Sequence, residues 1–147
     1  MSTLALLEAV HGHFGVLAAA ALLHPAILLR KGRPLSRGLR WSIGLTTLAA
    51  AIAFTSGLLI YPGYVAQVRP LLFHAAPRFG LLFETKEHLA FLCLATALGA
   101  GVTALLAPRE APALRRLAAS IYAVSATACI AVVVLGSVIA SIQTFAR

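Results

Sequence analysis

Four ionisable side chains stand together where a long apolar run begins, in the segment FETKEHLAFLCLATALGAG. This first group consists of Glu84, Lys86, Glu87 and His88. Imidazole and carboxylate groups at such spacing are able to bind a metal or to pass protons. Ionisable groups are costly inside lipid, so each of the four is a candidate functional residue if the run spans a membrane.

A second group of the same kind opens the first apolar run of the chain, and it contains Glu8, His11 and His13. Glu8 precedes His11 by three residues, and Glu84 precedes His88 by four, so each carboxylate shares a helix face with its histidine. The sequence therefore predicts two polar entrances of similar chemistry, one in each of two apolar segments. Their function depends on how these segments are arranged.

The composition indicates that the segments lie in a lipid bilayer. Of the 147 residues, 61% are hydrophobic and 11% are charged, whereas soluble domains carry about 25% charged and 45–50% apolar residues. We predict a single transmembrane domain over residues 1–147. The net charge of +8 resides between the apolar runs, as in cytoplasmic membrane loops, and this argues against nucleic acid as a partner.

Four apolar runs are long enough to cross a hydrocarbon core, which takes about 20 residues. They cover approximately residues 4–29, 41–60, 81–107 and 114–145. Only helices span a membrane as separate long apolar runs, because a strand leaves its backbone groups unpaired in lipid. The predicted fold is an all-α membrane protein, a four-helix transmembrane bundle with an outer-side loop between its second and third helices.

The basic residues predict the orientation of this bundle. Five of them lie in 30–40, between the first two runs, and three lie in 108–116, between the last two. The positive-inside rule places both segments in the cytoplasm, and hence both termini on the outer side of the inner (cytoplasmic) membrane. The less basic segment 61–80 then lies outside. Its prolines exclude a long helix there but leave room for one short interfacial helix.

Two histidines are expected at the same depth. His11 lies 19 residues before Arg30, and His88 lies 21 residues before Arg109. At 1.5 Å per residue their depths differ by about 3 Å. Two histidines at one level, on parallel helices that face each other across a bundle, can supply both axial nitrogens of a haem iron. We therefore predict one b-type haem with His11 and His88 as its ligands.

The neighbouring charges agree with this prediction. Arg69, Arg78 and Lys86 lie on the outer side, where they are candidates to bind the haem propionates. Glu8, Glu84 and Glu87 are candidates to move protons or to tune the potential of the iron. The other histidines have weaker cases, since His13 points to another face than His11, His24 has no partner at its level, and His74 lies in the outer loop.

Two other functional classes remain open on the same residues. The ExxH spacing of Glu8 and His11, with the carboxylates of the second group, suits a non-haem site of the di-iron type. The same side chains suit a proton or ion pathway. A third alternative is a non-redox assembly subunit whose polar cluster binds a partner.

The segments HGHFG and KEHLAF, in a four-helix plan, resemble the small membrane b-type cytochromes. These include the copper-resistance-D-type and protoporphyrinogen-oxidase-J-like groups and, more distantly, the haem anchors of succinate dehydrogenase. The resemblance implies one haem b between His11 and His88, and electron transfer to or from a quinone or a redox protein. We therefore expect an electron-transfer protein or a subunit of a membrane oxidoreductase, as a homodimer or within a larger complex. The proline-rich outer segment with His74 departs from these groups.

Overall fold

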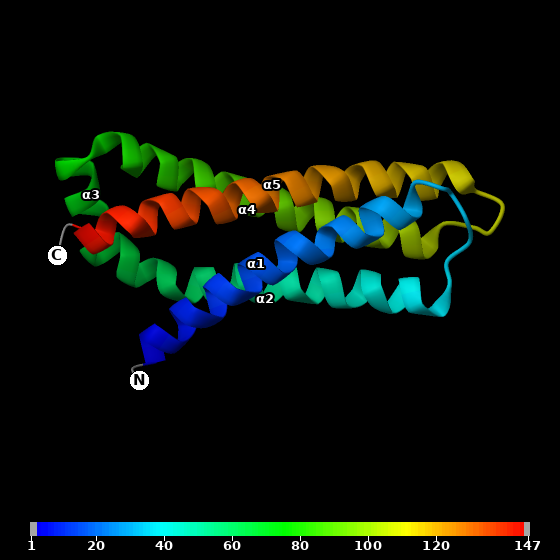
Figure 1. The fold of residues 1–147 in the computed structure, drawn as a ribbon, viewed down its shortest axis with the longest axis horizontal. Helices are drawn as coiled ribbons and strands as arrows, with labels where there is room; N and C mark the ends of the chain where they lie inside the picture. The colour runs from blue at the N-terminus through cyan, green and yellow to red at the C-terminus, as the bar shows by residue number, and fades with distance from the viewer. Residues whose placement is uncertain (1–2, 146–147) are drawn as a thin grey trace.

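The computed structural model describes residues 3–145, with the side chains of residue 3 and residues 5–141. The chain forms five α-helices: α1 (Thr3–Leu29), α2 (Arg37–Gln67), α3 (Arg69–Ala75), α4 (Pro77–Leu106) and α5 (Pro112–Phe145). All but α3 are long and apolar enough to cross a membrane. They run alternately up and down along one axis (Figure 1). The predicted all-α fold with four long apolar helices is confirmed.

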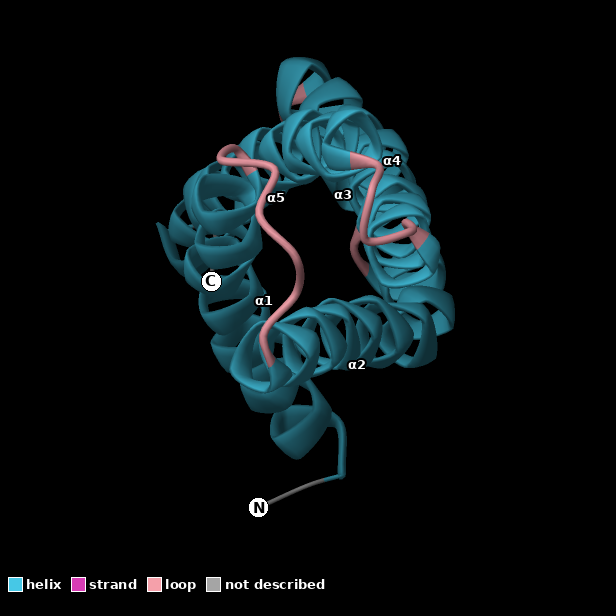
Figure 2. Ribbon diagram, turned by 90° about the vertical axis from the view of Figure 1, so that its right-hand side faces the viewer, coloured by secondary structure: helices cyan, strands magenta, loops and turns pink. Residues whose placement is uncertain are grey.

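The four long helices form a ring in which each packs against two neighbours. Contacts join α1 to α2, α2 to α4, α4 to α5 and α5 to α1, so α1 and α4 occupy opposite corners of the bundle (Figure 2). The core is built largely from alanines, among them Ala18, Ala97 and Ala118, which are fully buried. Small side chains let helix backbones approach closely where no hydrophobic effect drives them together.

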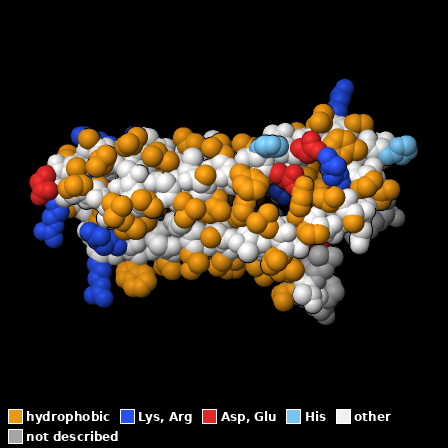
Figure 3. Space-filling view, turned by 180° about the vertical axis from the view of Figure 1, so that it is seen from behind, with side chains coloured by type: hydrophobic (Ala, Val, Ile, Leu, Met, Phe, Trp, Pro, Cys, Tyr) orange, Lys and Arg blue, Asp and Glu red, His pale blue; other side chains and the backbone are white. Residues whose placement is uncertain are grey.

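The two ends of the bundle differ in composition. The connections 30–36 and 107–111 meet at one end, which we call the basic end. The short helix α3 lies at the other, the α3 end, and both termini are directed toward it (Figure 1). One face of the molecule carries basic and acidic side chains at the basic end, and acidic, basic and histidine side chains at the α3 end, with apolar side chains in between (Figure 3).

A single buried arginine joins the two connections at the basic end. Arg115, on α5, is 2% exposed. Its Nε donates a hydrogen bond to the Gly32 carbonyl at 2.9 Å, and its Nη1 and Nη2 donate to the carbonyls of Pro108 at 2.5 Å and Arg109 at 2.9 Å. Gly32 has a φ of +62°, a conformation that glycine adopts at little cost. The guanidinium group thus replaces the hydrogen bonds that water would give to these loops.

The helices at the α3 end are longer than the sequence predicted. α2 continues through Pro62 to Gln67, so the expected loop 61–80 is almost wholly helical. Pro70 and Pro77 stand in the first turns of α3 and α4, where a missing N–H leaves no hydrogen bond unmade. They begin helices in place of ending them. The short helix that the prolines were expected to allow is α3.

Candidate functional site at the α3 end

The orientation of side chains around α4 decides which of its polar residues enter the bundle. Lys86 lies on the same stripe as Cys93 and Ala97, both of which are buried in the core. His88 comes two residues later, about 200° further around the helix. It lies on the exposed stripe with Leu92. Lys86, and not His88, is therefore the basic group that α4 directs into the interior.

His11 is the corresponding polar residue of α1. It is half-buried against α2, and its Nδ1–H donates a hydrogen bond of 2.8 Å to the Ala53 carbonyl. The ring lies directly on Gly57, where a Cβ atom would be 2.9 Å from His11 Cε1. Because Nδ1 is used as the donor, Nε2 is left as a free acceptor that faces away from that carbonyl. Gly57 makes the room that holds the ring in this position.

Lys86 extends from α4 toward the neighbouring helix α5. Its Cε would lie 3.6 Å from a Cβ atom on Gly136, and its Nζ lies 4.9 Å from the centre of the Phe83 ring. A cation over an aromatic face is attracted by the ring quadrupole. The ammonium group also interacts electrostatically with Glu87 and with His11. The Lys86 side chain thus contacts residues of α4 and α5, and its charge acts on His11 of α1.

Tyr64, on α2, packs against the same Phe83 ring. Its ring stacks on Phe83 with the centroids 3.6 Å apart and the planes 12° from parallel. The side chain is buried and interacts electrostatically with Glu87. Within the described part of the chain, its hydroxyl group has no hydrogen-bond partner. An unpaired buried hydroxyl is costly, and it is a ready ligand for water or an ion beside Glu87.

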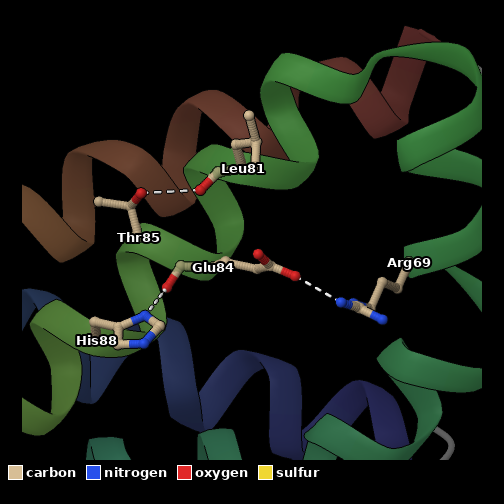
Figure 4. A network of polar contacts seen from close by, with 5 residues as sticks. All are labelled: Arg69, Leu81, Glu84, Thr85 and His88. Atoms are coloured by element: carbon tan, nitrogen blue, oxygen red, sulfur yellow. Dashed lines mark hydrogen bonds and ion pairs between the residues drawn. The ribbon is translucent and has the colours of Figure 1, made fainter.

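An ion pair joins α3 to α4 at the α3 end of the bundle. Arg69 Nη2 lies 2.6 Å from Glu84 Oε1 (Figure 4). This hydrogen bond is the largest of the effects that raise the pKa of Arg69. On the same helix, His88 Nδ1–H donates to the Glu84 carbonyl at 2.7 Å and Thr85 donates to the Leu81 carbonyl at 2.9 Å (Figure 4). The ion pair thus fixes α3 over the end of α4.

The structure brings some predicted site residues together and leaves others apart. The charge of Lys86 acts on both His11 and Glu87, and the Arg69–Glu84 ion pair also acts on Glu87. Glu8 and Arg78 are exposed, on α1 and in the first turn of α4. We refer to His11, Lys86, Glu87 and Tyr64 below as the charged centre.

The remaining histidines lie outside the charged centre. His13 is exposed, and its Nδ1–H donates to the Ala9 carbonyl of its own helix at 2.7 Å. His24 Nδ1 is 2.7 Å from Ser42 Oγ, in the half of the bundle nearer the basic end. His74 is exposed on α3. The structure shows His13, His24 and His74 in no common site.

A bis-histidine haem requires both ligand nitrogens to face one cavity. In this arrangement His11 lies on the inner side of α1, while His88 lies on the exposed side of α4, at the opposite corner of the ring. The two rings as placed therefore do not fit a haem between them. Among the described residues, no three His, Cys, Asp or Glu side chains are grouped so as to hold a metal ion.

Sequence reasoning did not single out several residues that build the charged centre. Tyr64 and Gly57 lie outside the two polar groups from which the sequence predicted a site. Phe83, Gly57 and Gly136 carry no chemistry of their own, and their contribution is the space or the surface they offer to His11, Lys86 and Tyr64. One feature of the sequence could have indicated this site: Lys86 lies on the stripe of α4 that faces the interior.

Comparison of the chain with protein-family models, with curated proteins and with solved structures finds no match.

Proposed function

We propose that this chain is a multi-pass protein of the inner membrane that moves protons through the charged centre. The observation that carries the proposal is the place of Lys86, whose ammonium group reaches into a bundle of membrane-spanning length between Phe83 and Gly136. A charged group at such depth is costly in lipid, and charged groups that face a bundle interior commonly line ion pathways or proton relays.

The partners of Lys86 suit proton transfer. Glu87 is half-buried and interacts electrostatically with Lys86 and with Tyr64, so it is able to take a proton from the α3 end. His11 keeps Nε2 free because its Nδ1–H is bonded to the Ala53 carbonyl. In the proposed sequence a proton enters on the Glu87 carboxylate and passes through water to His11 Nε2. The Lys86 charge stabilises the carboxylate while it is ionised.

Polar groups continue along the interior toward the basic end. The Ser125 hydroxyl donates to the Cys93 carbonyl at 2.8 Å in the middle of the bundle. One turn further, the Tyr122 hydroxyl lies close to Gly101 and beside Thr47. It is buried without a hydrogen bond of good geometry among the described residues. These groups give a proton or a water molecule partners along a core that is otherwise built from alanines.

The distribution of basic residues supports one orientation for this function. Both basic connections lie at the same end of the bundle, as the positive-inside rule requires of cytoplasmic loops. In the proposed orientation the basic end faces the cytoplasm, and the α3 end, the charged centre and both termini face the outer side. Protons then enter past the Arg69–Glu84 ion pair.

Proton flux into liposomes tests the proposal. We expect the reconstituted protein, with a pH-sensitive dye inside and a potassium diffusion potential, to conduct protons at least about tenfold faster than Lys86→Met or Glu87→Gln. This factor corresponds to about 1.4 kcal/mol in a barrier. Lys31→Met and Glu110→Gln make the same chemical changes at exposed positions of the basic end, and they should leave the flux unchanged. Flux at protein-free levels for the wild type, or equal loss in the control variants, would reject the proposal.

The b-type cytochrome predicted from the sequence is the second candidate, and one observation favours it. A haem-ligating histidine usually donates Nδ1–H to a carbonyl and keeps Nε2 for the metal, which is the state of His11. A reduced-minus-oxidised visible spectrum separates the two candidates. The proton-transfer proposal expects no α band from the purified protein after haem is added. A low-spin b-type spectrum that His11→Ala abolishes and Lys86→Met preserves would establish the cytochrome instead.

A further inference from the structure

A trough runs along the outward face of α5, from the basic end to the middle of the bundle. The half nearer the basic end, between α1 and α5, has a volume of about 310 Å³, and the other half, between α4 and α5, has about 400 Å³. Ala123 and Thr127 line both halves, so the two are continuous. Larger side chains line one side of each half, with Leu23 and Ile27 of α1 in the half nearer the basic end and Leu89 and Leu92 of α4 in the other half.

The floor of the trough is apolar although it contains two hydroxyl groups. Ser120 donates its hydroxyl hydrogen to the Arg116 carbonyl at 3.3 Å, and Thr127 donates to the Ala123 carbonyl at 2.9 Å. With these hydrogens bonded within α5, the surface offered to a neighbour consists mainly of methyl groups. Small residues on α5 beside larger ones on α1 and α4 therefore create a shallow apolar trough that could accept a hydrocarbon chain.

The length of the trough matches one leaflet of a bilayer. From Ser120 to Ala131, α5 rises by about 16 Å at 1.5 Å per residue. The hydrocarbon core of a bilayer is about 30 Å thick, so one leaflet is about 15 Å. A single acyl chain of the leaflet at the basic end would fill the trough without crossing the middle of the membrane.

The end of the trough carries positive charge. Arg30 lines it directly and is exposed. Arg116, also exposed, lies one turn before Ser120 on α5, so both cations are at the height where a phospholipid phosphate would lie. Arginine forms paired hydrogen bonds with phosphate oxygens. We propose that the trough binds one anionic phospholipid, with its phosphate at Arg30 and one acyl chain along α5. This inference requires only that the bundle spans a membrane, and it is independent of proton transfer.

Native mass spectrometry of the intact protein in detergent, with phosphatidylglycerol or phosphatidylcholine added, tests the inference. We expect one phosphatidylglycerol to be retained in preference to phosphatidylcholine by about fivefold, the effect of one basic residue near an anionic headgroup. Arg30→Gln should abolish this preference. Arg37→Gln is the matched control, because it removes the same charge from α2, at the corner opposite α5. It should keep the preference.

A second variant separates the trough from general charge attraction. Ala123→Phe fills the floor at an exposed position, so the fold should tolerate it, and it should lower the binding of both lipids. Equal loss of phosphatidylglycerol in Arg30→Gln and Arg37→Gln would show attraction by the net charge alone. Unchanged binding in Ala123→Phe would show that no acyl chain lies in the trough. Either result overturns the inference.

Discussion

Replacing Arg115 with alanine is expected to lower the free energy of unfolding by about 3 kcal/mol. The guanidinium group is buried and donates to three carbonyls from both connections of the basic end. Hydrogen bonds to a charged group contribute about 1.5–3 kcal/mol each, and part of the loss is recovered when water reaches the freed carbonyls. Thermal unfolding of the protein in detergent micelles, followed by circular dichroism, measures the change.

Arg116→Ala is the matched control for this prediction. Arg116 is the next residue on α5, has the same charge, and is exposed, so its removal should change stability by no more than about 0.5 kcal/mol. Arg115→Lys should fall between the two, because a lysine keeps the charge but lacks the planar group that reaches three carbonyls. Equal stability of Arg115→Ala and Arg116→Ala would show that the loops hold together without the guanidinium group.

The two arginines show which features a sequence can predict. Their shared charge and position indicated that this segment lies at the basic end of the bundle, and the structure places both there. Which of the two enters the interior depends on the 100° turn between neighbouring helical residues and on where the connection 30–36 passes. The path of that connection is fixed by a tertiary contact, between residues 83 positions apart in the chain. No local pattern contains it.

The same distinction explains the charged centre. Residue counting from the basic connections gave the level of His11 and of the polar group on α4, and His11 and Lys86 do interact across the bundle. Counting does not give the direction of a side chain around its helix, and there His88 and Lys86 differ by about 200°. Length and apolar character were enough to predict the four long helices. They were not enough to predict that Pro70 and Pro77 stand in the first turns of helices, because the prolines of this segment were expected to exclude a long helix.

Substitutions of Lys86 and Glu87, the two charged residues of the proposed proton pathway, are expected to have opposite effects on stability. Replacing a buried charged group by an apolar one of similar size is often neutral or stabilising. Lys86→Met keeps the contact of the side chain with Gly136, and its thioether can pack on the Phe83 ring in place of the ammonium group. It should therefore raise the free energy of unfolding by about 1–2 kcal/mol. Glu87→Gln leaves the Lys86 ammonium without its nearest carboxylate and should lower that free energy by about 1–2 kcal/mol.

Thermal unfolding of both variants, beside Lys31→Met and Glu110→Gln, measures this contrast. The controls change exposed residues at the basic end and should lie within about 0.5 kcal/mol of the wild type. A variant that gains stability while it loses proton flux identifies Lys86 as a residue kept for function at the expense of stability. If Lys86→Met instead destabilises the fold by more than about 1 kcal/mol, Lys86 is part of the packing between α4 and α5. Its presence in the interior then no longer argues for proton transfer.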